Sequence, residues 1–210
     1  MPFHLSKLKI PYIAQRHSEI WDTELIFDSG GCYHIRARSG QGKSSLIHTL
    51  YGIQKNYEGK LFFKGKNAGV YTQDEWCDVR ARQLSIVFQD LRLFDDMTAL
   101  QNLLVKNELT AFTSVDNVLL WADRLGIGHA LQRKIHTLSY GERQRVAIIR
   151  ALLQPFECLL LDEPFSHLDQ ENIRVASELI FEEVSKKMAT LIVCDLESDT
   201  HFPYHANLNL

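Results

Sequence analysis

The sequence has little of several features that would have placed it in a specialised class of protein. Its four cysteines, Cys32, Cys77, Cys158 and Cys194, are widely separated and form no Cys-x-x-Cys pair, which argues against a disulfide framework and against a structural zinc site. The nine histidines are scattered and show no paired metal-ligand spacing. Repeats, low-complexity segments and Gly/Ser/Pro-rich linkers are also missing. We therefore expect one domain over residues 1–210.

Long hydrophobic runs and an excess of basic residues are missing too. The longest apolar runs, such as 118–122 and 191–194, are far shorter than the roughly 20 residues that a membrane-spanning helix needs. The first ten residues, MPFHLSKLKI, lack the apolar core and cleavage site of a secretory signal. The formal net charge is -3 with both signs interspersed, so we expect no nucleic-acid partner. These absences predict a soluble, cytoplasmic protein.

The order of the predicted elements indicates an α/β fold. Short β-like runs separated by turn residues predict a strand-rich lobe in the first third, at 5–10, 24–27, 32–37 and 60–63. Apolar residues at helical spacing predict a helix over 44–53 and a helical insertion at about 90–138. The last third predicts helix 139–153, strand 157–162, helix 170–187 and strand 189–194. Such an alternation of strands and helices implies a parallel sheet.

Residues 37–45, ARSGQGKSS, lie between a predicted strand and a predicted helix, which is the context of a phosphate-binding loop. Gly40 and Gly42 would let backbone N–H groups converge on phosphate oxygens at a helix N-terminus. We expect Lys43 to reach the β- and γ-phosphates and the Ser44 hydroxyl to bind Mg2+. Further nucleotide contacts are expected from neighbouring loop residues, namely Ser39, Gln41 and Ser45. The usual pattern GxxxxGK[ST] begins with glycine, but here that position is Ala37. An ordinary glycine-rich turn with a surface lysine is the alternative.

The run CLLLDEP, residues 158–164, predicts a buried strand that ends in two carboxylates. Ligands bind at the carboxyl ends of parallel strands. We expect Asp162 to hold the metal ion and Glu163 to polarise the attacking water. Without the phosphate loop, such a segment would most often be a strand-to-turn junction with solvated acids.

Residues 138–145, LSYGERQR, resemble the signature motif of ATP-binding cassette (ABC) ATPases. Gln89, in SIVFQD, lies where this family has its Q-loop glutamine, and residues 166–169, SHLD, resemble its D-loop. All five motifs occur in the family's order, so the resemblance covers nearly the entire chain. It implies a phosphate-loop NTPase fold: a RecA-like core with a parallel sheet, an antiparallel β lobe and an inserted α-helical subdomain. It also implies ATP and Mg2+ as cofactors, with Gln89 acting in both metal binding and catalysis beside Lys43 and Glu163.

The resemblance further implies a head-to-tail homodimer, in which the signature of one protomer covers the ATP held by the other. Ser139, Gly141 and Glu142 are the residues expected to make these contacts. Tyr140 stands where the family has the first signature glycine, which leaves the local contact geometry open. The alternative for this segment is a plain amphipathic helix start.

Family members also pair with a separate membrane subunit, whose coupling helix enters a groove near residues 89–105. The apolar candidates for that contact are Leu91, Leu93, Phe94 and Met97. A packing role inside the helical lobe is an equal alternative for each of them.

Two further positions are less well defined by the resemblance. Tyr12 is the nearest match to the aromatic residue that stacks on adenine, with His17 or Trp21 as alternatives. Asp195 stands where the family usually has a histidine that reaches the γ-phosphate. Two like charges 4 Å apart repel by about 4 kcal/mol at an effective dielectric near 20, so an ionised Asp195 cannot simply replace that histidine. We expect slow hydrolysis unless His201 folds back into its place.

The short length and the stretch VFQDLRLFDDMTALQNLLV resemble small cassettes of lipoprotein release, macrolide efflux and bacterial cell division. The resemblance therefore implies an ATPase subunit on the cytoplasmic face of the inner membrane. Soluble ABC proteins of DNA repair or translation typically carry coiled coils, a second cassette or basic arms, and this sequence has none. A weakly hydrolysing regulatory switch is the remaining alternative. It is favoured by Ala37, Tyr140 and Asp195 and opposed by Glu163.

Overall fold

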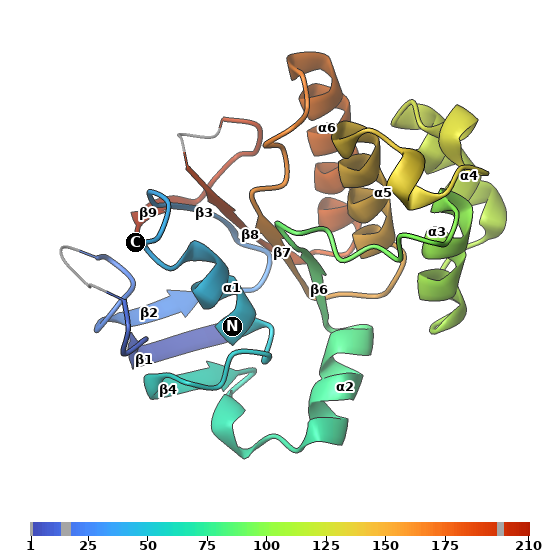
Figure 1. The fold of residues 1–210 in the computed structure, drawn as a ribbon. Coiled ribbons are helices and arrows are strands. Elements are labelled where there is room, and N and C mark those ends of the chain that lie inside the picture. Colours follow the sequence, from blue (N-terminus) through green and yellow to red (C-terminus); the bar gives the residue numbers. More distant parts are fainter. Residues whose placement is uncertain (1, 14–17, 197–199) are drawn as a thin grey trace.

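The computed structural model describes residues 2–13, 18–196 and 200–210, and it contains two sheets (Figure 1). The first sheet pairs its strands antiparallel in the order β2-β1-β4-β5. Its strands are β1 (Phe3–Lys9), β2 (Glu24–Phe27), β4 (Glu58–Phe63) and β5 (Lys66–Asn67). The second sheet is parallel, in the order β6-β7-β8-β3-β9. Its strands are β3 (Cys32–Arg36), β6 (Leu84–Val87), β7 (Cys158–Asp162), β8 (Thr190–Asp195) and β9 (Ala206–Asn209). The predicted α/β class with an antiparallel lobe is confirmed.

The parallel sheet separates two hydrophobic cores, and β7 shows how. Leu159 and Leu161 face one core, whereas Cys158 and Leu160 face the other. A strand buried on both faces reads as a continuous apolar run, which explains the sequence CLLLD. Helix α1 (Lys43–Leu50) lies between the two sheets, and α5 (Tyr140–Leu152) and α6 (Gln170–Lys186) cover the opposite face of the parallel sheet (Figure 1).

The predicted helical insertion contains α3 (Ala99–Glu108) and α4 (Val115–Arg124), followed by the short 3-10 helices η2 (Gly128–Ala130) and η3 (Ile135–Thr137). Thr98 caps α3 in a capping box with Gln101. The buried side chain of Asn102 fastens the preceding loop to this helix. It accepts a hydrogen bond from Phe94 N (2.8 Å) and donates to Phe94 O (3.1 Å) and Thr98 O (3.0 Å).

The prediction has no counterpart for the strands β5, β6 and β9, for the 3-10 turn η1 (Ala68–Val70) or for the helix α2 (Gln73–Arg82) that follows it. A capping box between Thr72 and Glu75 begins α2 and was readable in the sequence. Helix α1 also ends three residues before its predicted limit, because Tyr51 and Gly52 form a turn in which Gly52 has a φ of 74°. Within the described residues, no helix is both long and apolar enough to cross a membrane.

Candidate functional site

The glycine-rich loop connects β3 to α1 and lines a cavity of about 250 Å3. Gly40 and Gly42 have φ values of 80° and 98°, in the region that only glycine adopts without strain. A Cβ at Gly42 would also lie 2.4 Å from Ile13 Cδ1. The cavity is lined by Tyr12, Ile13, Ser39, Gly40, Gly42, Lys43, Ser44, Ser45, Gln89 and Glu163. The fold therefore brings most of the predicted nucleotide site together. Gln41 is not in this lining, and its side chain accepts a hydrogen bond from Arg38 N.

Lys43 is buried at the start of α1. Its ammonium group donates to Ala37 O at 2.9 Å and forms an ion pair with Glu163 Oε1 at 3.2 Å. The Ala37 carbonyl, at the position where the motif expects glycine, therefore holds the lysine at the floor of the loop. Replacement of that glycine by alanine leaves this backbone contact intact.

Glu163 follows β7 with a φ of 49°, a left-handed conformation that is uncommon for a residue with a Cβ. Its backbone N–H donates to Cys194 O at 2.9 Å, which fixes it beside the end of β8. Gln89 Nε2 donates to Glu163 Oε2 at 3.3 Å, and Ser44 Oγ donates to Gln89 Oε1 at 3.2 Å. Three motifs that are distant in sequence thus meet through their side chains.

Asp162 carries the clearest signal for a cation. It is 1% exposed, and no described residue forms a hydrogen bond of good geometry with its carboxylate, although the Ser44 hydroxyl lies near enough to lower its pKa. Burial raises the pKa of this carboxyl to about 6. A buried carboxylate with so few donors fits a hard cation such as Mg2+, and Ser44 and Gln89 could supply further oxygen ligands at this end of the sheet. The described residues contain no cluster of three His, Cys, Asp or Glu side chains, so phosphate oxygens or water would complete the coordination.

The signature residues lie at the N-terminus of α5 and not in the phosphate cavity. Ser139 Oγ accepts from Glu142 N (3.2 Å), and Glu142 Oε2 accepts from Ser139 N (2.7 Å), which forms a capping box. Glu142 also pairs with His129 at 3.1 Å. A Cβ at Gly141 would lie 3.0 Å from His167 O, so the D-loop packs directly against this turn. One chain alone therefore does not bring Ser139, Gly141 or Glu142 to its own phosphate loop.

In the structure, two of the candidates for adenine stacking differ in solvent exposure. Tyr12 is 63% exposed at the edge of the cavity, and its hydroxyl accepts from Gln54 Nε2 at 2.6 Å. Trp21 is buried in the core, so it cannot present a face to adenine and that alternative was wrong. His17 lies outside the described residues.

Asp195 ends β8 at the same edge of the sheet as Asp162 and Glu163. Its Oδ1 accepts a hydrogen bond from Leu196 N at 2.6 Å, and its backbone O accepts from Ala37 N at 3.2 Å. The ring of His201 packs edge-on against Phe165, with centroids 5.7 Å apart, and does not line the phosphate cavity.

A second cavity of about 220 Å3 lies between β6, α3 and α5, where the coupling contact was expected. Phe94 lines it and is 55% exposed, as predicted. Leu91 was a wrong choice because it is buried in the core, and Leu93 and Met97 are half-buried and outside this lining. The sequence interpretation missed Val105 and Leu109, which lie on α3 and just after it and expose their side chains to the cavity.

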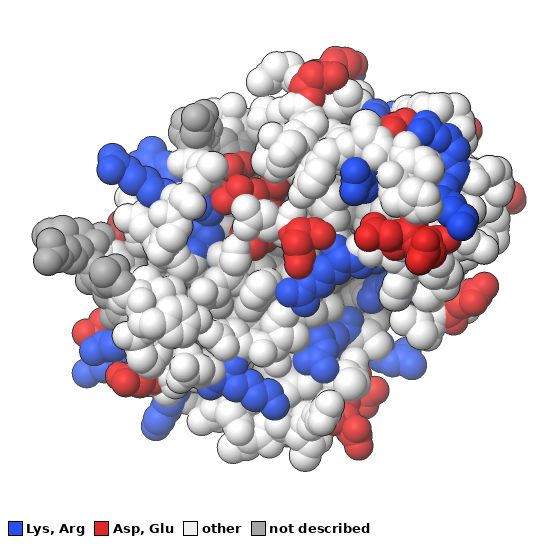
Figure 2. Space-filling model, in the orientation of Figure 1, with Lys and Arg blue, Asp and Glu red and all other residues white. Residues whose placement is uncertain are grey.

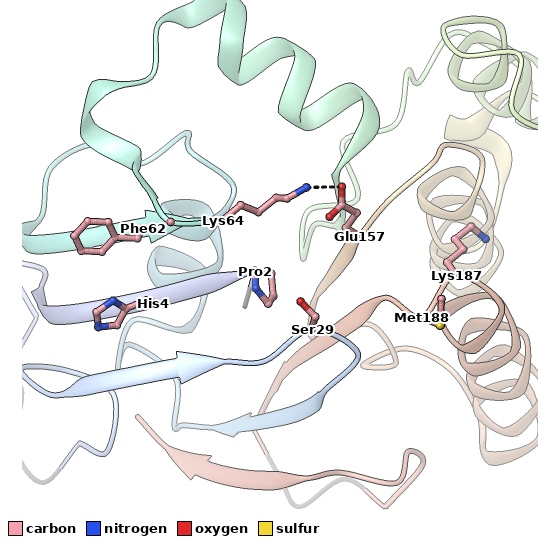
Figure 3. A pocket seen from close by; sticks show the side chains of 9 residues that line it. Pro2, His4, Ser29, Phe62, Lys64, Glu157, Lys187 and Met188 are labelled. Atoms are coloured by element: carbon pink, nitrogen blue, oxygen red, sulfur yellow. Dashed lines mark hydrogen bonds and ion pairs between the residues drawn. The ribbon is translucent and has the colours of Figure 1, made fainter.

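A larger cavity, about 870 Å3, lies elsewhere (Figure 3). It opens beside β1, β4 and the end of α6, and an ion pair between Lys64 and Glu157 (2.9 Å) crosses it. None of the phosphate-loop residues lines it, so its size does not make it the nucleotide site. Basic and acidic side chains are interspersed on the face shown in Figure 2, as the composition predicts.

A glycine-rich loop between a strand and a helix, a buried lysine beneath it and carboxylates at the end of the adjacent strands define a phosphate-loop nucleotide-binding protein. Residues 21–166 match the ABC transporter family, and the chain belongs to this family. The lipoprotein-releasing system ATP-binding protein LolD of Legionella pneumophila (strain Lens) is 34% identical over 173 residues, which are 81% of this chain and 76% of LolD.

Other matches agree with this assignment. The molybdenum import ATP-binding protein ModC of Methylococcus capsulatus is 39% identical over 153 residues, covering 70% of this chain and 41% of ModC. A dimeric post-hydrolysis structure of the ATP-binding cassette MJ0796, bound to ADP and Pi, superimposes with a TM-score of 0.79 at 23% identity. That superposition covers 93% of this chain and 88% of MJ0796. At this level of identity the structural likeness shows the shared fold.

Proposed function

We propose that this chain is the ATP-binding and ATP-hydrolysing subunit of an ABC transport or mechanotransmission complex. The observation that carries the proposal is one cavity that is lined by the glycine loop, Lys43, Gln89 and Glu163 and lies beside the buried carboxylate of Asp162. The names of its relatives, a lipoprotein-releasing system and a molybdenum import protein, support a role in transport. We place the chain on the cytoplasmic face of the inner membrane, as a partner of a separate membrane subunit.

The contacts of Lys43 suggest the order of events at the site. Its ammonium is paired with Glu163 at 3.2 Å. Phosphate oxygens of ATP at the N-terminus of α1 compete for this ammonium and for the loop N–H groups. Loss of the ion pair leaves the Glu163 carboxylate free to accept a proton from the attacking water. Ser44, Gln89 and Asp162 would hold Mg2+, which neutralises charge on the phosphates.

The second half of the site comes from another copy of the chain. Ser139 accepts a hydrogen bond from Glu142 N, and its own hydroxyl proton remains available for a phosphate oxygen. The N-terminus of α5 adds backbone N–H groups, including that of Gly141. Because these groups lie outside the chain's own phosphate cavity, we propose a head-to-tail homodimer with two ATP molecules between its protomers.

The groove at β6 and α3 is the proposed contact with the membrane subunit. Phe94, Val105 and Leu109 expose apolar surface to it, and Lys106 and Arg150 add positive charge. The described residues that line this groove include no carboxylate. A short amphipathic helix with an apolar anchor fits such a surface.

Phosphate release from the purified chain tests the proposed activity. We expect the parent chain to release phosphate from ATP, whereas Lys43→Ala and Glu163→Gln lower the rate by at least about 100-fold. Lys60→Ala, on the surface of β4, serves as the control and should match the parent. If the parent binds ATP but releases phosphate no faster than Glu163→Gln, the chain is a weakly hydrolysing regulatory switch and not a motor.

Asp195 is proposed to make this ATPase slow. An ionised carboxylate at the end of β8 repels the γ-phosphate, where a histidine would donate a hydrogen bond. We expect Asp195→His to raise the single-turnover rate of hydrolysis. A rate no higher than that of the parent would contradict this role.

A further inference from the structure

Five residues form a closed ring of contacts around the base of the site. Gln89 Nε2 donates to the Glu163 carboxylate at 3.3 Å, and the Glu163 backbone O accepts from Gln144 Nε2 at 3.2 Å. Gln144 Oε1 accepts from the backbone N–H of His167 at 3.2 Å. The His167 ring lies against the ring of Tyr140, with centroids 4.0 Å apart and planes at 41°. The Tyr140 hydroxyl donates to Gln89 O at 3.1 Å, which closes the ring.

The members of this ring come from four different segments. Gln89 follows β6, Glu163 follows β7, His167 belongs to the turn before α6, and Tyr140 and Gln144 lie in the first turns of α5. Gln144 is buried and both ends of its amide are satisfied, so its side of the ring is rigid. The part of this contact ring made by Tyr140 is different, because Tyr140 is 37% exposed and its side chain contributes little to the hydrophobic core. Its contacts therefore act mainly on the two segments that it joins.

The Tyr140 link depends on a side chain that glycine does not have. With glycine at this position, neither the hydroxyl contact to Gln89 O nor the ring contact to His167 could form. The phosphate-facing groups do not need this side chain, because Ser139 supplies its hydroxyl and Gly141 its backbone. The Tyr140 side chain thus links Gln89 to His167 and leaves the Ser139 hydroxyl and the Gly141 backbone available to the nucleotide.

We propose that Tyr140 is a positioning residue for hydrolysis: it anchors the backbone of Gln89 to the signature turn and the D-loop, and so keeps the Gln89 side chain in register with Ser44 and Glu163. The kinetic part of this proposal rests on the proposed ATPase function. The structural part, which concerns the backbone at residue 89, can be measured without nucleotide. The two parts can therefore fail separately.

Tyr140→Phe is the informative substitution, because it keeps the ring on His167 and removes only the hydroxyl. Tyr71→Phe is a matched control, since the Tyr71 hydroxyl also donates to a backbone carbonyl, Phe63 O at 3.4 Å, but in the antiparallel lobe. We expect Tyr140→Phe to speed amide hydrogen exchange in residues 88–92 by about five-fold in the nucleotide-free chain, the size expected for one lost hydrogen bond. In ATP hydrolysis, kcat should fall about five-fold with KM for ATP unchanged, because the phosphate loop is untouched.

Tyr140→Gly removes both contacts and should have a larger effect on exchange and on kcat than Tyr140→Phe. The proposal is overturned if Tyr140→Phe matches the parent in exchange, or if Tyr140→Gly hydrolyses ATP at least as fast as the parent. A rise in KM with unchanged kcat would also overturn it, since that would place the hydroxyl in ATP binding. If no form of the chain releases phosphate, the ATPase proposal fails, and the exchange data alone decide whether Tyr140 holds Gln89.

Discussion

At the scale of single residues, Asp162 lowers the stability of the metal-free chain, and the same buried carboxylate is suited to bind a cation. Its carboxylate is buried, and burial raises its pKa to about 6 although the nearby Ser44 hydroxyl lowers it. At neutral pH the folded, metal-free chain therefore carries an unfavourable buried charge. A bound cation would remove that cost, so the same arrangement that weakens the free chain favours Mg2+ and nucleotide.

Asp162→Asn should stabilise the metal-free chain in a pH-dependent way. The folded pKa, about 6, lies above the ordinary value of 3.8, so the ionised carboxylate destabilises the fold above pH 6. That penalty declines as the pH falls below 6 and is gone below about pH 3, where folded and unfolded chains are both protonated. We expect the asparagine variant to be more stable by about 2–3 kcal/mol at pH 8 and equal to the parent near pH 3. Urea unfolding without nucleotide or metal measures this.

Asp96→Asn is the control, because the Asp96 side chain is 97% exposed, and its effect should be small at both pH values. A destabilised Asp162→Asn chain at pH 8, or a gain that does not change with pH, would show that Asp162 is not held as a strained ionised group.

Most of the residues that meet at the candidate site could be predicted, because the expected phosphate and metal chemistry depends on fixed spacing. Gly40, Lys43 and Ser44 follow from a loop of set length, and Asp162 and Glu163 from their place after a buried strand. The contacts made by backbone atoms could not be predicted in the same way. Ala37 O binds Lys43 whatever its side chain is, and Gln89 O binds Tyr140 for the same reason. When a backbone atom makes the contact, the type of residue at that position does not indicate it.

At the scale of elements, most of the fold was predictable, but the helix α2 and the two edge strands of the parallel sheet, β6 and β9, were not. Strand β2 has the predicted bounds, and α5 and α6 differ from prediction by one residue at most at each end. Strand β9 reads ANLN, with little apolar character and no alternation strong enough to identify it. It forms because it pairs with β3 at the edge of the parallel sheet, a contact between residues about 170 positions apart.

The loop before α3 offers a prediction at this scale. Asn102→Ala removes three hydrogen bonds to the backbone of Phe94 and Thr98, and we expect it to lower the free energy of unfolding by about 1–3 kcal/mol. Asn107→Ala is a matched control, because Asn107 is also buried and bonds the backbone of Thr113 at the other end of α3. Urea unfolding should give similar losses for both variants.

Only Asn102→Ala should loosen the side of the groove that carries Phe94. Hydrogen exchange in residues 92–98 should rise in this variant and stay at the parent rate in Asn107→Ala. Equal exchange in both variants would mean that the groove does not depend on Asn102.

At the scale of the whole molecule, the two proposed halves of the nucleotide site do not face each other within one chain. The phosphate loop and carboxylates lie at the carboxyl ends of the parallel strands, whereas the signature turn begins α5 outside that cavity. In the proposed head-to-tail homodimer, a second copy would join the two halves. Dimerisation should then depend on the γ-phosphate, and it should be lost after hydrolysis because the anion between the protomers is gone.

The most direct test of this account is the molar mass of the purified chain in ATP and Mg2+, measured by light scattering on the parent, Glu163→Gln and Lys43→Ala. We expect Glu163→Gln to form a stable dimer with ATP but not with ADP, Lys43→Ala to stay monomeric, and the parent to dimerise only transiently while it releases phosphate. A Glu163→Gln chain that binds ATP and remains a monomer would contradict the shared site, and with it the central claim that two copies of this chain close around ATP.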